Sequence, residues 1–225
     1  MNNQIHQILD KIYPVNNHVA IVAHGEFPKN DKLIELIKKA KTIICCDGAI
    51  TNLLAHDIIP DYIIGDCDSL PDKIFTDFAA KIIKIPEQQN NDLTKAVNFA
   101  TEKLQENNIQ IFAATGLRED HTVGNIALLA KYAKLTKRIA ILSDYGIFTV
   151  HNGKNKIKTI PGQQVSLFSA AHDLRLNSEG LVWDLNDFQL DFWYQGTLNQ
   201  AVGDNFQLDS NGLVIVYRAF EVKTN

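Results

Sequence analysis

Two carboxylates, Asp66 and Asp68, follow a short apolar run at residues 62–64. The run Tyr-Ile-Ile is typical of a buried strand, and Gly65 ends it. In an extended chain, residues two apart point to the same side, so both carboxylates are expected to point together beyond the strand. Two anions held this close repel each other unless a cation compensates, and oxygen ligands favour a hard cation such as Mg²⁺.

Further polar side chains follow other predicted strands. They are Asp47, Gln88, Asp92 with Lys95, and the run Arg118, Glu119, Asp120 and His121. Taken singly, each has an ordinary explanation: Asp92 as a helix-capping acid, Lys95 as a solvated helix charge, and residues 118–121 as a capped helix start. Together they fall where parallel strands end, which is the edge at which ligands bind. Carboxylates that gather Mg²⁺ beside a lysine and an arginine are what phosphoryl chemistry needs.

The elements that must position these residues alternate along the first part of the chain. Short apolar strands are followed by amphipathic helices, which predicts a mostly parallel, doubly wound, Rossmann-like α/β sheet covered on both faces. The expected strands are 18–23, 42–46, 62–64, 81–85, 109–114 and 138–142, and the longer expected helices are 30–40, 92–105 and 122–135.

The pattern changes after about residue 143. Short strands punctuated by Gly, Pro and Asn-Gly turns predict an antiparallel β-sandwich, with strands that include 181–183 and 189–194. The sequence therefore predicts two domains: residues 1–144 as the α/β domain and residues 145–225 as the β-sandwich domain.

Composition excludes several classes of protein. The chain has 22 basic and 26 acidic residues and a net charge of −4, which argues against a nucleic-acid surface. No apolar run reaches membrane-spanning length, and the N-terminus does not resemble a signal peptide. The three cysteines, two of them adjacent, do not form a disulfide framework, so a cytoplasmic location is expected. The Walker A, G-x-G-x-x-G, G-x-S-x-G and H-E-x-x-H motifs are absent.

Four motifs in order resemble those of thiamine pyrophosphokinases. They are Cys-Asp-Gly-Ala at 46–49, Pro-Asp-Tyr-Ile-Ile-Gly-Asp-Cys-Asp-Ser at 60–69, Asn-Asp-Leu-Thr-Lys-Ala at 91–96, and Arg-Glu-Asp-His at 118–121. The resemblance runs from about residue 18 to the end, and it includes the β-rich second half and Gly-Thr-Leu-Asn at 196–199. Several motifs at matching intervals are more specific than any one of them.

The resemblance implies a homodimer that transfers pyrophosphate from ATP to thiamine in a Mg²⁺-dependent reaction, with active sites at the dimer interface and AMP as the other product. It also implies roles for individual residues. By the resemblance, the metal ligands are Asp66, Asp68 and Asp92, and Asp47 helps to shape the metal site. Lys95 and Arg118 contact phosphates, and Asp120 and His121 lie alongside the nucleotide. The residues implied to contact thiamine are Gln88, Trp183, Thr197 and Asn199.

The sequence departs from the family pattern at several positions, of which Leu198 has the clearest consequence. A serine is usual before Asn199, so a hydroxyl group is lost where the vitamin is expected to bind. Two alternatives therefore stay open. One is a pyrophosphokinase for another hydroxymethyl acceptor, such as a pterin, and the other is a non-catalytic nucleotide- or thiamine-binding protein. From sequence alone, Trp183 is also compatible with a place in the sandwich core.

Overall fold

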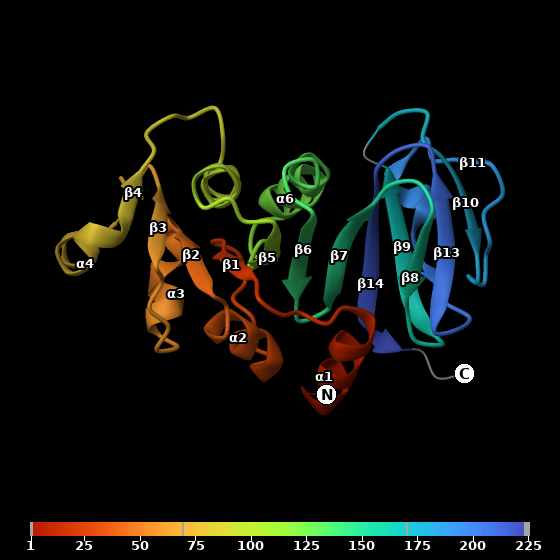
Figure 1. Cartoon of the computed structure of the whole chain (residues 1–225), viewed down its shortest axis with the longest axis horizontal. Helices are drawn as coiled ribbons and strands as arrows, with labels where there is room; N and C mark the ends of the chain where they lie inside the picture. The colour runs from red at the N-terminus through yellow and green to blue at the C-terminus, as the bar shows by residue number, and fades with distance from the viewer. Residues whose placement is uncertain (1, 69, 170, 223–225) are drawn as a thin grey trace. The chain divides into compact units, whose positions relative to one another are not determined.

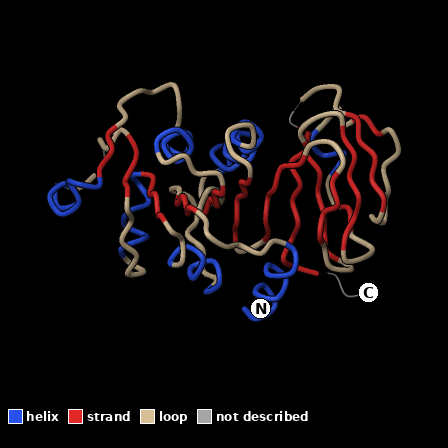
Figure 2. The backbone as a smooth tube through the Cα atoms, viewed as in Figure 1, coloured by secondary structure: helices blue, strands red, loops and turns tan. Residues whose placement is uncertain are grey.

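The computed structural model describes residues 2–68, 70–169 and 171–222, so Ser69 of the carboxylate motif lies outside the described residues. Contacts divide the chain into two compact units (Figures 1 and 2). One unit is Asn16–Ser143, and the other combines Asp144–Asn225 with Met1–Val15. Among the helices of the described residues, none has the length and apolar character needed to cross a bilayer.

The first unit is built on a parallel sheet. Its strands are β1 (Val19–Val22), β2 (Thr42–Cys46), β3 (Tyr62–Gly65), β4 (Ile82–Lys84), β5 (Asn108–Phe112) and β6 (Arg138–Ser143). They are ordered β6-β5-β1-β2-β3-β4, and each neighbouring pair is parallel. The central strands are buried along their whole length, which requires helices on both faces. The predicted doubly wound parallel sheet is confirmed.

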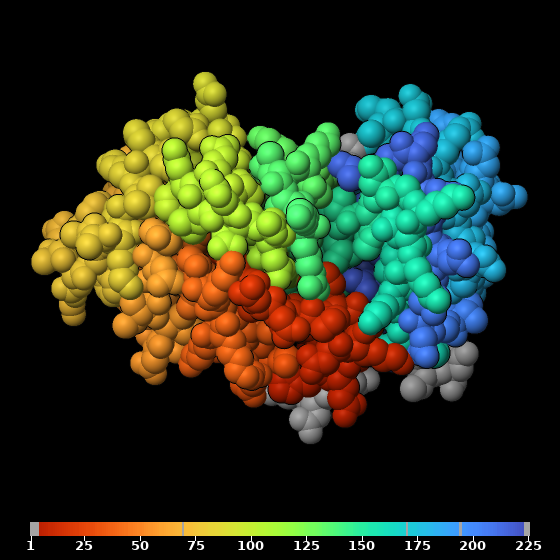
Figure 3. Space-filling model, viewed as in Figure 1, coloured from red at the N-terminus to blue at the C-terminus, as the bar shows by residue number. Residues whose placement is uncertain are grey.

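Helices connect these strands. They are α2 (Asp31–Lys38), α3 (Ile50–Leu54), α4 (Asp72–Phe78), α5 (Asp92–Asn98) and α6 (Glu119–Tyr132), with helical turns η1 (Asp47–Ala49), η2 (Ala79–Lys81) and η3 (Phe99–Lys103). In Figure 1, α6 lies on one side of the sheet, and α2 and α3 lie on the other. Figure 3 shows the segment of α4 and β4, coloured yellow, at one end of this unit.

The starts of the helices follow from their capping residues. Asn30 caps α2, and Asn91 caps α5 by accepting a hydrogen bond from the backbone N–H of Thr94 at 2.9 Å. The expectation that Asp92 is the cap is therefore wrong by one residue. Helix α6 begins three residues before its predicted start, with Arg118 as the extended residue that precedes it.

The second unit contains two antiparallel sheets. Its strands are β7 (Gly146–His151), β8 (Asn155–Lys158), β9 (Gln163–Ser169), β10 (Arg175–Glu179), β11 (Phe188–Gln189), β12 (Asn199–Gln200), β13 (Asn205–Ser210) and β14 (Val214–Val222), with a turn η4 (Trp193–Gly196). One sheet has the order β12-β9-β14-β7 and the other β11-β10-β13-β8. The predicted antiparallel β-sandwich is confirmed.

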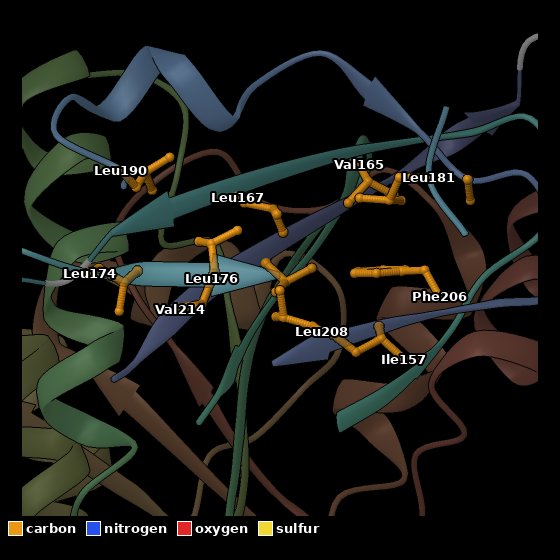
Figure 4. Packing of buried hydrophobic residues seen from close by; sticks show 12 residues of the cluster. Ile157, Val165, Leu167, Leu174, Leu176, Leu181, Leu190, Phe206, Leu208 and Val214 are labelled. Atoms are coloured by element: carbon orange, nitrogen blue, oxygen red, sulfur yellow. The ribbon is translucent and has the colours of Figure 1, made fainter. Parts of the chain in front are cut away.

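The core of the second unit is a cluster of hydrophobic side chains (Figure 4). Burial alternates strictly along β9, so Val165 and Leu167 point into the cluster. Leu176 and Leu208 join it from β10 and β13, and Phe206 is fully buried. Burying each of these side chains contributes about 2 kcal/mol to the hydrophobic stabilisation.

Two local predictions for this part of the chain are wrong. Residues 181–183 are not a strand, because Leu181 makes a single bridge to Ala201 and the chain then turns away. The predicted strand 189–194 is shorter, since β11 ends at Gln189 and η4 follows.

A helix that the sequence analysis did not predict, α1 (Asn2–Ile12), packs on β14 and β8 of the second unit. The sequence prediction had placed these residues in the first domain. Buried Arg218 donates from Nη1 to the carbonyl oxygens of Ile12 at 3.3 Å and Lys158 at 2.7 Å, and Lys11 Nζ lies 2.7 Å from Asp204 Oδ1. A guanidinium group suits the carbonyl end of a helix, which carries partial negative charge.

Candidate functional site

The first unit has a topological switch point beside β1. The chain runs from β1 through β2 and β3 to β4, and β5 then returns to the other side of β1. Ligands of such sheets bind outside the carboxyl ends of the strands at this point. The loops after β1 and β5 meet there: Gly25 N–H donates to Ala113 at 2.6 Å and Glu26 N–H donates to Thr115 at 2.8 Å.

Sequence reasoning missed the role of Gly25 at this switch point. A Cβ atom on Gly25 would lie 2.5 Å from the carbonyl oxygen of Thr115, so no larger residue fits between the two loops. A glycine that follows a predicted central strand was the signal, because such a residue permits a close backbone approach.

Asp47 connects the end of β2 to the loop after β3. It is 7% exposed, and its carboxylate accepts hydrogen bonds from Gly48 N–H at 2.6 Å and Cys67 N–H at 3.0 Å. Gly65 lies against it, and a Cβ there would be 2.4 Å from Asp47 Oδ2. Burial and the charge of Asp92 raise the pKa of Asp47, against the opposing effect of the two backbone hydrogen bonds.

The geometry of Asp66 and Asp68 differs from the extended chain on which the prediction was based. Cys67 between them has φ +59°, and Asp68 N–H folds back to Asp66 Oδ1 at 3.3 Å. Asp66 Oδ2 accepts a hydrogen bond from Gln88 Nε2 at 2.9 Å, and Asp68 Oδ1 lies 3.0 Å from Lys84 Nζ. The hydrogen bond from Gln88, together with that from Asp68 N–H and the nearby lysine charges, lowers the pKa of Asp66.

Asp92 and Lys95 form an ion pair at the start of α5. Lys95 is 3% exposed, so the expectation of a solvated helix charge is wrong, and its Nζ lies 3.0 Å from Asp92 Oδ1. Burial acts to lower the pKa of Lys95, but the hydrogen bond and charge of Asp92, with the charges of Asp66 and Glu87, outweigh it and raise the pKa. The ammonium group therefore stays charged at neutral pH.

The acidic side chains have the oxygen donors that a hard cation prefers. The charges of Asp92 and Asp66 both act on Asp47, which is the mutual repulsion that a divalent cation would relieve. Over residues 2–68, 70–169 and 171–222, however, no group of three or more His, Cys, Asp and Glu side chains is close enough as it stands to hold a metal ion. Instead, the carboxylate oxygens of Asp68, Asp66 and Asp92 accept hydrogen bonds from Lys84, Gln88 and Lys95, respectively.

Arg118, Asp120 and His121 lie together at the start of α6. Arg118 Nε and Nη2 donate to the two carboxylate oxygens of Asp120 at 3.1 and 2.6 Å, and His121 N–H donates to Asp120 Oδ1 at 2.9 Å. This bidentate contact raises the pKa of Arg118 and lowers that of Asp120. The loop before them turns through left-handed conformations at Gly116 and Leu117, with φ +77° and +61°, which leaves Arg118 exposed.

In the second unit, Trp183 and Asn199 are joined by their hydrogen bonds. Trp183 is 61% exposed and therefore does not belong to the sandwich core. Asn199 is buried, donates from Nδ2 to the Trp183 carbonyl at 2.7 Å, and accepts from the N–H groups of Trp183 and Gln200 at 3.2 and 2.8 Å. Asn199 thus positions the backbone of Trp183, while half-buried Thr197 and 74% exposed Leu198 precede it.

Comparisons with known proteins agree over both units. The family model "Thiamin pyrophosphokinase, catalytic domain" matches residues 33–141, and "Thiamin pyrophosphokinase, substrate-binding domain" matches residues 146–217. Thiamine pyrophosphokinase of Bacillus subtilis is 37% identical over 100 residues, which are 43% of this chain and 46% of that protein. The chain thus spans about half the length of this curated relative.

A plant relative is matched over a longer region. Thiamine pyrophosphokinase 1 of Oryza sativa is 30% identical over 205 residues, covering 78% of this chain and 76% of that protein. Among solved structures, thiamine pyrophosphokinase from Bacillus subtilis has a TM-score of 0.76 and 25% identity, covering 90% of this chain and 99% of that chain.

Proposed function

Because this chain belongs to the thiamine pyrophosphokinase family, we propose that it transfers pyrophosphate from ATP to the hydroxyl group of thiamine, giving thiamine diphosphate and AMP. The observation that carries the proposal is the set of charged residues at the carboxyl edge of the parallel sheet, where Asp66 and Asp92 act electrostatically on both Asp47 and buried Lys95. The names of the matched proteins favour thiamine over a pterin as the acceptor.

The proposed metal ligands are Asp66, Asp68 and Asp92. A divalent cation bound there, Mg²⁺ in this proposal, would neutralise the negative charge of the phosphate oxygens. Asp68 is exposed and would become available for this role if Lys84 turned away, because the ion pair they form is solvated and weak. Asp47 keeps the loop after β3 in place through its bond to Cys67 N–H.

The proposed phosphate ligands are Lys95 and Arg118. The acceptor oxygen attacks the β-phosphorus, the bond from that phosphorus to the oxygen bridging to the α-phosphorus breaks, and AMP leaves with that oxygen. The hydroxyl proton passes to a carboxylate, Asp92 or Asp66. Because no activated nucleophile is needed, positioning and charge supply the catalysis. Asp120 and His121 lie alongside the nucleotide in this proposal.

The proposed thiamine ligands include Trp183, whose exposed ring suits a cationic aromatic ligand. Asn199 holds the Trp183 backbone in place, and Thr197 lies on the same segment as Asn199. Gln88, which follows β4, is the remaining residue proposed to bind thiamine.

A homodimer and a cytoplasmic location complete the proposal. Large apolar side chains are exposed on two hydrogen-bonded segments of the second unit: Val182 and Trp183 on one, and Leu198 and Val202 on the other, at 49 to 74% exposure. Such a group of exposed apolar side chains supports an interface with a second copy. Light scattering coupled to size exclusion measures the mass directly.

The test of the proposed function uses the purified protein with ATP, Mg²⁺ and thiamine, followed by chromatography. AMP and thiamine diphosphate are expected in equal amounts, and replacing thiamine with a hydroxymethylpterin is expected to abolish AMP release. Binding of ATP and thiamine without turnover would instead favour a non-catalytic binding protein.

A further inference from the structure

A chain of hydrogen bonds joins α5, α6 and the loop after β5. Thr94 Oγ1 lies 2.7 Å from the Tyr132 hydroxyl and 2.7 Å from Asn91 Oδ1. Asn91 Nδ2 donates to Asn125 Oδ1 at 3.2 Å, and Asn125 Nδ2 donates to the carbonyl oxygen of Ala114 at 2.8 Å. Four hydrogen bonds thus lead from Tyr132 in the last turn of α6 to Ala114 in the loop after β5.

The direction of these hydrogen bonds is determined by their chemistry. Asn91 Oδ1 also accepts from Thr94 N–H, so its amide cannot be reversed without placing an NH₂ group against that donor. The Thr94 hydroxyl then donates to Asn91 and accepts from Tyr132. Burial raises the pKa of Tyr132, which keeps its hydroxyl a donor. A consistent direction strengthens each bond of such a chain.

Several residues of this hydrogen-bond chain are buried. Tyr132 is 0% exposed, Thr94 is 1% exposed and Asn125 is 8% exposed. A buried polar group that loses its partner is costly, so this arrangement resists local change. Asn91 itself is exposed, and buried Thr94 and Asn125 hold its side chain from both sides, which connects the start of α5 to the loop after β5.

Two members of this hydrogen-bond chain, Asn91 and Ala114, lie on the segments that carry the proposed phosphate ligands. Asn91 is the residue before Asp92 and caps the helix that carries Lys95. Ala114 lies in the loop that leads from β5 to Arg118. Neither Asn91 nor Asn125 has a role in the reaction proposed above.

We propose that Asn125, with Asn91, is a positioning residue that holds the start of α5 and the loop after β5 in a common arrangement, so that Lys95 and Arg118 engage one polyphosphate together. The inference rests on the proposed function, since it specifies how that site is held. Neither asparagine touches the reacting atoms. Their effect is on the relative position of two charged groups that come from different elements.

This positioning is important for nucleotides with several phosphates. A triphosphate needs both cationic groups at one spacing, whereas AMP has one phosphate and depends less on that spacing. Small misplacements of positioned groups reduce binding and turnover strongly. Loss of the connection is therefore expected to weaken triphosphate binding and to leave AMP binding nearly unchanged.

The experiment compares Asn125→Leu, Asn91→Ser and the double variant. Asn125→Leu keeps the volume and removes both hydrogen bonds of the amide, while serine at position 91 remains a good helix cap but is too short to reach Asn125. Calorimetry measures binding of α,β-methylene-ATP, in which the bond that would break is blocked, and of AMP, each with Mg²⁺. The matched control is His18→Leu, which removes a buried 3.0 Å hydrogen bond to the Leu36 carbonyl at the opposite edge of the sheet.

Asn125→Leu is expected to bind the triphosphate analogue about tenfold more weakly and AMP within about twofold of the unchanged protein. The double variant is expected to match Asn125→Leu alone, because both substitutions interrupt the same connection. His18→Leu is expected to bind both nucleotides normally. If Asn125→Leu fails to fold, Asn91→Ser decides with the same pair of nucleotides.

The inference is overturned if the asparagine variants bind the triphosphate analogue as His18→Leu does, or if AMP binding falls by the same factor. The proposed function fails separately, if the unchanged protein binds nucleotide but releases no AMP in the presence of thiamine.

Discussion

Replacement of Lys95 by methionine tests the electrostatic part of the account. Methionine keeps an unbranched apolar side chain in a place where lysine is 3% exposed, and it removes only the ammonium group. Asp92 is left with a side chain that is 33% exposed and therefore hydrated, so the fold is expected to lose no more than about 1 kcal/mol.

The loss of turnover is expected to be much larger than the loss of stability. The ammonium group is held at 3.0 Å from Asp92 in a water-poor position, where a fixed charge acts strongly on phosphate oxygens. Removal of one such preorganised group costs about 100-fold in kcat, or about 2.7 kcal/mol. The raised pKa of Lys95 also predicts that activity shows no loss from its deprotonation until the pH exceeds 10.5.

The assay for this prediction is initial AMP release at saturating ATP and thiamine, with the unfolding free energy measured by urea titration. The matched control is Lys39→Met, since Lys39 pairs with Glu35 on α2 but is 70% exposed. The control is expected to change the unfolding free energy by less than about 0.5 kcal/mol and to leave turnover unchanged. Turnover in Lys95→Met above half of the unchanged value would show that the Lys95 charge is not needed for the reaction.

Three further substitutions are informative. Asp68→Asn is expected to lower kcat by at least about 100-fold while the unfolding free energy stays the same, because the side chain is 72% exposed; normal AMP release would contradict its metal role. Trp183→Ala is expected to raise KM for thiamine between about twofold and 30-fold and to leave KM for ATP unchanged; an equal change in both would argue against a thiamine contact. Burial, with the charge of Arg218, lowers the pKa of His151 to about 4. The pKa of His151 in the unfolded state is 6.5, so below that pH the unfolded state binds a proton that the folded state does not, and stability falls as the pH drops towards 4. His151→Leu is expected to recover up to about 3 kcal/mol of unfolding free energy at pH 4. Identical urea midpoints of the two proteins at pH 4 would exclude this effect.

The parallel sheet could be predicted because its strands are buried on both faces and read as continuous apolar runs. The N-terminal helix could not, because residues 2–12 are stabilised by contacts with β8 and β14, far along the chain, and by Arg218. Trp183 also depends on distant partners, since its exposed position follows from hydrogen bonds to Asn199.

The candidate site was predictable in its residue types but not in its pairings. The carboxylates of Asp66 and Asp68 were expected to point to the same side, as in an extended strand. The left-handed conformation of Cys67 changes the direction of the chain between them. Lys95 gave no sign of its burial, because its spacing from Asp92 is equally typical of a surface ion pair. The role of Gly25 depends on how closely the loops after β1 and β5 approach, which no local pattern encodes.

The most direct measurement is the product stoichiometry of the purified protein incubated with ATP and thiamine, with and without Mg²⁺. One AMP is expected for each thiamine diphosphate, with no ADP and no product after chelation of the metal. Formation of ADP with thiamine monophosphate, or product that is independent of a divalent cation, would contradict the proposed function.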